Sequence, residues 1–259
     1  MFTYILTTNE EGVFQIRLNR PEVLNALHTG ILLELKQAFE IARDDASIRV
    51  ILLTAEGDKA FCSGADLKAT LASQQATDTL LRTYYNPLIQ LIRDIPKPII
   101  CYLNGLAAGA GASLALSCDV VIAREQAYLS QIFIQIGLMP DAGATFFLPR
   151  LVGLARAFEL ATTGRKVYAK EAVERSLIQK CVGDQEIEGV LSATIQHYKN
   201  APTRAIGMIK QAFNQSQHAS LPEMLEFEAI HQEILTRSAD AQIGIQSFLE
   251  KKPPVYQGK

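Results

Sequence analysis

The sequence predicts an α/β protein with a mostly parallel sheet at its core and a helical C-terminal part. Strand-type and helix-type patterns alternate through the first part of the 259 residues. The apolar run at 50–53 is continuous, which is typical of a strand covered on both faces. From residue 185 onward almost every segment has helical spacing. Strand–helix units come first and helices alone follow, which gives the predicted architecture.

The first elements are a hairpin and a helix. Residues 2–8 and 13–19 alternate as strands do, and Glu10-Glu11-Gly12 between them favours a hairpin turn. A loop is predicted at 61–67 and a helix over roughly 76–93. The helix after the hairpin is indicated by apolar residues at helical spacing, namely Ile31, Leu32, Leu35, Ala38, Phe39 and Ala42.

The stretch Ile99–Cys118 has no charged residue and is long enough to span a bilayer. Asn104 inside it and the small residues of its second half favour another interpretation. We expect a buried strand at 99–103, a tight turn and a helix over 109–117. No contact with a membrane is therefore expected.

A strand at 120–123 and a helix over 143–162, broken at Gly153, complete the predicted core. We divide the chain into a core of residues 1–195 and a helical region of residues 196–259. The helical region carries more apolar surface than a short appendage needs, and that surface could pack on its own core or on a second subunit. Its apolar residues include Leu221, Met224, Leu225, Phe227, Ile230, Ile234 and Leu235.

Composition narrows the function. Apolar residues make up 48% of the chain, which excludes intrinsic disorder. A net charge of −2 argues against nucleic acid or an anionic membrane as the main partner. The N-terminus lacks the pattern of a secretory signal. The cysteines have apolar neighbours and no CxxC spacing, so buried free thiols in a cytoplasmic protein are expected for Cys62, Cys101, Cys118 and Cys181.

Two segments rich in small residues could bring backbone groups close to a ligand. They are Ser63–Leu67, in a loop, and Asn104–Ser113, which runs from a strand end into a helix. If they converge, two backbone N–H groups would face one oxygen, the geometry of an oxyanion hole. Close helix packing or a Rossmann-like turn explains the glycines equally well, although the third glycine of GxGxxG is absent.

Five segments together resemble the crotonase (enoyl-CoA hydratase/isomerase) superfamily and occur in the family's order along the whole chain. The resemblance implies a crotonase-like spiral of ββα units with a helical C-terminal trimerisation region, in a homotrimer or a dimer of trimers. It implies an acyl-CoA thioester as substrate and no metal or redox cofactor, since CoA is part of the substrate. The segments are Asn19-Arg20-Pro21, Asn25-Ala26-Leu27, Phe61–Leu67, Asn104–Asp119 and Gly137–Gly143.

The resemblance also assigns roles by position. The oxyanion donors correspond to the amides of Ala65 and Ala110. Asp66 is expected near substrate, or else to stabilise its own loop. Lys251 and Lys252 could reach CoA phosphates or simply form a solvated helix end. The other positions expected beside CoA or the acyl group are Val23, Leu24, Ala26, Ser63, Leu67, Gly109 and Phe133.

Departures from the family pattern indicate the reaction. Hydratases of this family use two glutamates, and the corresponding positions are Ser113 and Phe133. Neither can activate water, so ordinary hydration is not expected. With Tyr85-Asn86-Pro87 and Leu138–Asp141, the chain is most similar to the branch that isomerises epoxyphenylacetyl-CoA in bacterial phenylacetate breakdown. The single catalytic aspartate of that branch corresponds to Asp141.

We therefore expect Asp141 to remove the C2 proton of a 3-enoyl thioester and to return it at C4. An apolar pocket lined by Phe133 should raise the pKa of Asp141. Capping of the helix that begins near residue 143 is the alternative for this aspartate. The competing functions are hydration with water held by Asp141 and Ser113, nucleophilic attack by Asp141, and a non-catalytic CoA-binding protein.

Overall fold

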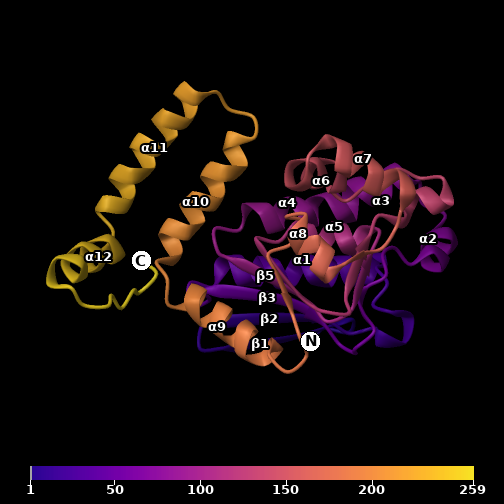
Figure 1. Ribbon diagram of the computed structural model, residues 1–259, viewed down its shortest axis with the longest axis horizontal. Helices are drawn as coiled ribbons and strands as arrows, with labels where there is room; N and C mark the ends of the chain where they lie inside the picture. Colours follow the sequence, from indigo (N-terminus) through magenta and orange to yellow (C-terminus); the bar gives the residue numbers. More distant parts are fainter. Residues whose placement is uncertain (1) are drawn as a thin grey trace.

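The computed structural model describes residues 2–259, and its larger sheet has six strands in the order β1-β2-β3-β5-β7-β10 (Figure 1). The β1–β2 pair is antiparallel and the other pairs are parallel, so the predicted mostly parallel sheet is confirmed. The strands are β1 Ile5–Glu10, β2 Val13–Leu18, β3 Val50–Ala55, β5 Ile99–Leu103, β7 Val120–Arg124 and β10 Lys180–Val182.

The predicted hairpin forms, but its first strand begins at Ile5 instead of residue 2. The reason is a competing set of hydrogen bonds. The amides of Thr3 and Tyr4 donate to the carboxylate of Glu34 at 2.8 and 2.7 Å instead of to a neighbouring strand. The strand then continues to Glu10, and Glu11 and Gly12 turn the chain with positive φ angles.

A second, smaller sheet has the order β4-β6-β8-β9. Strands β3, β5 and β7 of the large sheet are followed directly by β4, β6 and β8 of the small one, which produces the expected spiral of ββα units. The sequence did not indicate these strands because each has only two or three residues. Phe61 and Cys62, predicted as loop, lie in one of them. The strands are β4 Ala60–Cys62, β6 Leu106–Ala108, β8 Tyr128–Ser130 and β9 Val167–Tyr168.

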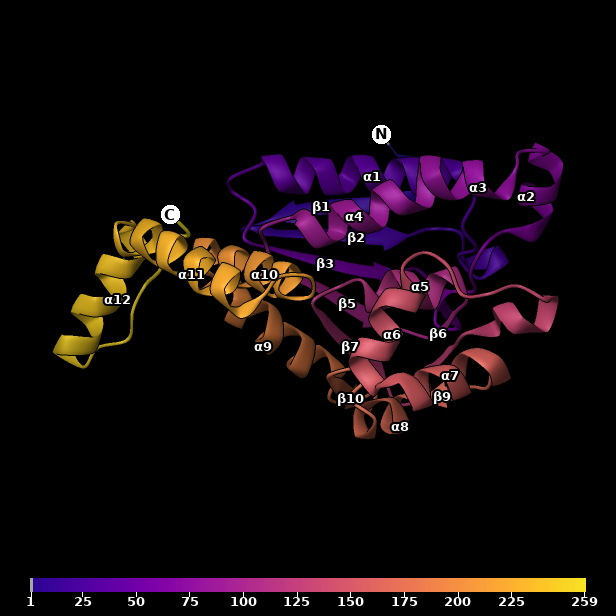
Figure 2. The ribbon, with the colours of Figure 1, turned by 90° about the horizontal axis from the view of Figure 1, so that it is seen from above.

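Helices cover both faces of the large sheet (Figure 2). Ile51 and Leu53 of β3 point into the core cluster that includes α1 (Thr29–Asp44) and α4 (Asn86–Asp94). Val50 and Leu52 point the other way, toward α9 (Ile187–Lys199). This is the physical basis of the continuous apolar run. The six residues predicted as the apolar side of the first helix are its buried residues.

The helix predicted over 76–93 forms with an irregularity. It consists of α3 (Thr77–Leu80), the π-helical turn η2 (Leu81–Tyr85) and α4. A short helix α2 (Leu67–Ser73), not predicted, precedes it. The uncharged stretch forms β5, β6 and α5 (Ala110–Leu116), as expected apart from the inserted strand β6. None of the helices described in residues 2–259 is both long and apolar enough to cross a membrane.

Beyond β8 the chain is mostly helical. The break predicted at Gly153 is confirmed, because this residue separates α6 from α7. The helices and the 3-10 turn of this part are η3 Ile132–Ile136, α6 Ala144–Val152, α7 Leu154–Thr163 and α8 Ala169–Glu174.

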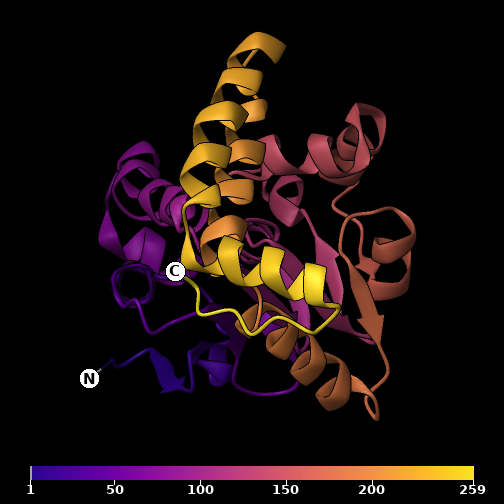
Figure 3. The same cartoon turned by 90° about the vertical axis from the view of Figure 1, so that its left-hand side faces the viewer.

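The last three helices form an arm that extends from the core (Figure 1). They are α10 Thr203–Ser216, α11 Leu221–Thr236 and α12 Ala239–Glu250. Helix α11 runs along α10, and α12 turns across them (Figure 3). Buried Lys210 attaches α10 to the core through a 2.8 Å ion pair with Asp119. The predicted division at residue 195 falls inside α9 and stays a prediction.

Candidate active site

The segment around Leu24 and the loop around Ala65 are held side by side by backbone hydrogen bonds. The amide of Ser63 donates to the carbonyl of Leu24 at 3.0 Å. Leu27 bonds to Gly64 and to Asp66, both at 2.8 Å, and so pairs with the residues on either side of Ala65. This parallel bridge leaves the amide of Ala65 pointing away from it. That amide donates to no group within residues 2–259.

The second predicted donor lies against the first. Ala110 is the first residue of α5, where an amide has no partner within its helix. Gly64 has a φ of +103°, and a Cβ there would lie 2.9 Å from the carbonyl oxygen of Ala108 and 3.6 Å from the amide nitrogen of Ala110. Only glycine permits this approach. The fold thus places the loop that carries the Ala65 amide against the amide of Ala110.

The aromatic ring of Phe133 lies against the segment that carries the Ala110 amide. Phe133 is 7% exposed and belongs to η3. Its Cζ atom is 3.8 Å from the position a Cβ would take on Gly109, the residue before Ala110. Phe133 therefore forms an apolar wall beside the residue that precedes Ala110.

Asp141 lies on the loop between η3 and α6. Its Oδ1 atom is buried and has no hydrogen-bond partner among the described residues. Helix α6 begins after Gly143 without a side-chain cap, so the carboxylate of Asp141 does not cap it. Burial raises the pKa of Asp141 to about 6, the direction expected from the sequence. The site thus holds a carboxylate that can exchange a proton near neutral pH.

Ser113 is a buried support for that loop. Its hydroxyl donates to the carbonyl oxygen of Asp141 at 2.9 Å and contacts that of Gly109 at 3.3 Å. The side chain is fully buried and its proton is directed at these carbonyls. Ser113 therefore positions the backbone of Asp141.

Asp66 holds its own loop. Its carboxylate accepts from the amide of Ala69 at 3.1 Å at the start of α2, and from Arg20 at 3.2 Å. The bond from Ala69, followed by the Arg20 contact, lowers the pKa of Asp66. Arg20 also donates to the carbonyl of Ala26 at 2.6 Å. The sequence did not reveal this role of Arg20, because 46 positions separate it from Asp66 and only folding brings them together.

The residues expected to contact CoA differ in exposure. Val23, Leu24 and Leu67 are exposed apolar side chains, whereas Ala26 is buried. Lys251 and Lys252 follow α12, which lies on the opposite side of the molecule from α2 and Leu67 (Figure 1). Within one chain these lysines are therefore not part of the site.

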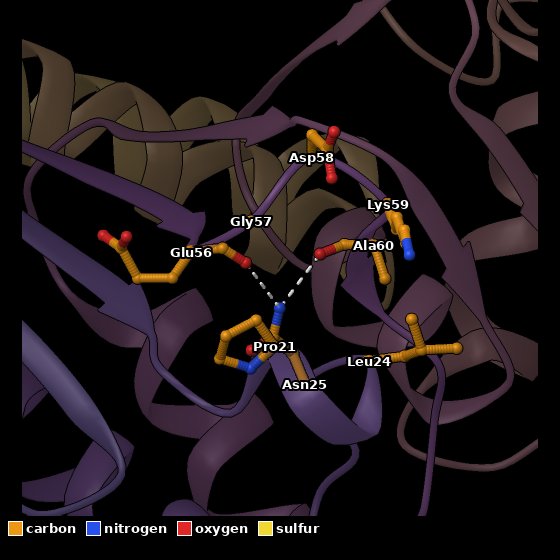
Figure 4. A pocket seen from close by; sticks show the side chains of 8 residues that line it. All are labelled: Pro21, Leu24, Asn25, Glu56, Gly57, Asp58, Lys59 and Ala60. Carbon is orange, nitrogen blue, oxygen red and sulfur yellow. Dashed lines mark hydrogen bonds between the residues drawn. The ribbon is translucent and has the colours of Figure 1, made fainter.

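Leu24 also borders a pocket of about 200 Å³ (Figure 4). The amide group of Asn25 crosses it and donates to the carbonyls of Glu56 and Ala60 at 3.1 and 2.9 Å. These bonds hold the turn in which Leu24 and Asn25 both have positive φ angles. Of the residues predicted to contact substrate, Leu24 is the one that lines this pocket.

The thiol nearest to this loop is that of Cys62. Cys62 is buried behind Gly64, whose amide contacts its Sγ atom at 3.4 Å. Burial raises the pKa of this thiol to about 12, so it stays protonated. In the part of the chain that the structure describes, His, Cys, Asp and Glu form no group of three or more suited to a metal ion.

Comparisons with known proteins identify the family of this chain. Residues 8–259 match the family described as enoyl-CoA hydratase/isomerase. A probable enoyl-CoA hydratase of Rhodobacter capsulatus is 45% identical over 96% of both chains. The 1,2-epoxyphenylacetyl-CoA isomerase of Escherichia coli is 38% identical over the full length of both. The crystal structure of an enoyl-CoA hydratase from Bacillus anthracis superposes with a TM-score of 0.92 and 32% identity, covering 99% of this chain and 100% of that one.

Proposed function

This chain belongs to the enoyl-CoA hydratase/isomerase family, whose members act on acyl-CoA thioesters, and we propose that it is an acyl-CoA isomerase. It moves a double bond through an enolate held in an oxyanion hole, with Asp141 as the single base and acid. One observation carries the proposal. The carboxylate of Asp141 has a buried oxygen without a partner among the described residues, on a loop that Ser113 joins to the helix of Ala110. The resemblance assigns Ser113 and Phe133 to the positions of the family's two glutamates.

The first step is removal of a proton. The thioester carbonyl oxygen accepts hydrogen bonds from the amides of Ala65 and Ala110. Asp141 takes the C2 proton, and the electron pair of the C2–H bond forms a dienolate whose charge rests on that oxygen. Each amide stabilises this charge by about 3 kcal/mol, judged from comparable sites. A carboxylate with a pKa of about 6 is a stronger base than an ordinary aspartate.

The second step returns the proton. The carboxylic acid formed on Asp141 protonates C4, the carbonyl re-forms, and the double bond then lies between C2 and C3. Proton and electrons balance, so the proposed reaction needs no metal or redox cofactor. Phe133 keeps water from the reacting carbons, which favours isomerisation over hydration.

Hydration is the second candidate, because the Rhodobacter relative is described as a probable hydratase. It requires a group that activates water, and Asp141 would have to serve alone. The Escherichia relative's name favours ring isomerisation of an epoxyphenylacetyl thioester, which the same oxyanion hole and base would support. A non-catalytic CoA-binding protein is the remaining alternative.

A paired ultraviolet assay tests these candidates. One cuvette holds 3-hexenoyl-CoA and the other 2-hexenoyl-CoA, each with the unaltered protein, Asp141→Asn and the control Asp94→Asn, an exposed aspartate on α4. We expect conjugation to appear in the first cuvette, to persist in the second, and to be lost only with Asp141→Asn. Loss of conjugation in the second cuvette would show hydration. No absorbance change in either cuvette with any of the three proteins would favour the non-catalytic alternative.

We also propose that the chain assembles as a homotrimer or a dimer of trimers in the cytoplasm. The arm carries large apolar side chains that nothing in one chain covers, which supports an interface between copies. The four free thiols support a reducing compartment. Analytical ultracentrifugation measures the assembly. The exposed residues of the arm include Phe213, Leu221, Leu225, Ile230, Ile245, Phe248 and Leu249.

A further inference from the structure

Tyr85 ends an irregular helical turn next to the site. The amide of Asn86 donates to the carbonyl of Leu81, five residues back, which defines η2 as a π-helical turn. Such turns insert one extra residue into a helix and are frequent at functional sites. The extra residue rotates Tyr85 relative to α3 before the regular helix α4 begins.

Contacts on two sides fix where Tyr85 lies. It lines a small cavity together with Leu27, the residue that brackets Ala65. One helical turn further along, Ile89 faces the loop of the base, because a Cβ on Gly143 would lie 3.2 Å from its Cγ2 atom. Residues four apart share one face of a helix. Tyr85 thus faces the space between the Ala65 amide and the Asp141 loop.

The hydroxyl of Tyr85 is a donor without a partner. Burial raises its pKa, and the carboxylates of Asp141 and Asp66 raise it further, so the proton stays in place. No described residue accepts a hydrogen bond from it. Tyr85 is half-buried, so this hydroxyl is free to bond to water or to a ligand.

We propose that Tyr85 is a specificity-determining residue whose hydroxyl donates a hydrogen bond to an oxygen carried by the acyl group. The inference rests on the proposed function, which puts the acyl group between Ala65 and Asp141. It gives the site a preference for oxygen-bearing acyl groups over pure hydrocarbons. A site with a polar group aimed at a substrate oxygen disfavours the analogue that lacks it, since the protein group is then left unpaired.

A binding cycle tests this contact. The ligands are phenylacetyl-CoA and 2-hydroxyphenylacetyl-CoA, which differ by one oxygen near the reacting carbon. Their Kd values are measured by isothermal titration calorimetry on the unaltered protein, Tyr85→Phe and the control Tyr84→Phe, which removes a hydroxyl from the preceding residue of η2. We expect the unaltered protein and Tyr84→Phe to prefer the hydroxylated ligand about tenfold, the worth of one buried hydrogen bond. Tyr85→Phe should bind both ligands alike.

Three outcomes overturn the inference: no preference in the unaltered protein, a full preference in Tyr85→Phe, or an equal weakening of both ligands by that variant. A preference retained by Tyr85→Phe would assign the contact to Asp141. The proposed function is tested separately with 3-hexenoyl-CoA, which has no acyl oxygen beyond the thioester. Failure to isomerise it contradicts that function and leaves the measured oxygen preference intact.

Discussion

The hydroxyl of Ser113 donates a hydrogen bond to the backbone carbonyl of Asp141 at 2.9 Å, across 28 positions of sequence. Ser113 lies one helical turn after Ala110 on α5. One short helix therefore positions both an oxyanion donor and the loop of the proposed base. This buried contact joins the helix of the proposed oxyanion donor to the loop of the proposed base.

Replacing Ser113 by alanine should lower the kcat of isomerisation about 10- to 100-fold with little change in KM, because the loop of Asp141 is released but the CoA contacts remain. The control is Ser117→Ala, a buried serine whose hydroxyl bonds only to Leu114 in its own helix. Both constants are measured with 3-hexenoyl-CoA. Equal kcat losses in the two variants would contradict a positioning role.

The rate should depend on the ionisation of Asp141. Its pKa is raised to about 6, and the base must be deprotonated to act. We expect kcat to be constant above this pH and to fall about tenfold per pH unit below it. A pH–rate profile at saturating 3-hexenoyl-CoA measures this limb. A fall in kcat centred near pH 4 would mean that the carboxylate of Asp141 is solvated when the substrate is bound.

Asp141→Asn should stabilise the fold at neutral pH. A raised folded pKa means that the charged carboxylate costs stability above pH 6, while the protonated form carries no such cost below the unfolded pKa. We expect a gain of about 1–2 kcal/mol at pH 7.5, less than the full shift implies because the side chain is partly open to solvent. The gain should vanish near pH 4. Urea unfolding at both pH values measures it, and a gain of equal size at both would contradict the linkage.

Gly64→Ala should abolish isomerisation, because the new methyl group would meet the carbonyl of Ala108 and part the two amides. Gly153→Ala is the matched control, since its φ of +76° imposes similar backbone strain but nothing lies within 4 Å of the new Cβ. Both variants should lose about 1–3 kcal/mol of unfolding free energy. Only Gly64→Ala should lose activity in the ultraviolet assay, and retained activity would argue against close convergence of the two loops.

Sequence patterns were sufficient to predict the helices and strands that bury long apolar surfaces. The six apolar positions of α1 and the continuous run of β3 were predicted correctly, because each pattern repeats over several turns or residues. The break at Gly153 was also predicted, since glycine interrupts helices by itself. The short strands of the small sheet were not, because two or three residues carry no readable period.

For the site, the sequence by itself determined which residue types are available: Asp141 on a loop, two stretches of small residues, and Ser113 and Phe133 at the positions that the resemblance assigns to the family's glutamates. Only the tertiary structure decided how they are used. It left the amide of Ala65 unpaired, turned the hydroxyl of Ser113 onto the carbonyl of Asp141 and buried a carboxylate oxygen. Unpaired donors and raised pKa values arise from burial and from contacts between distant segments, and neither exists until the chain has folded.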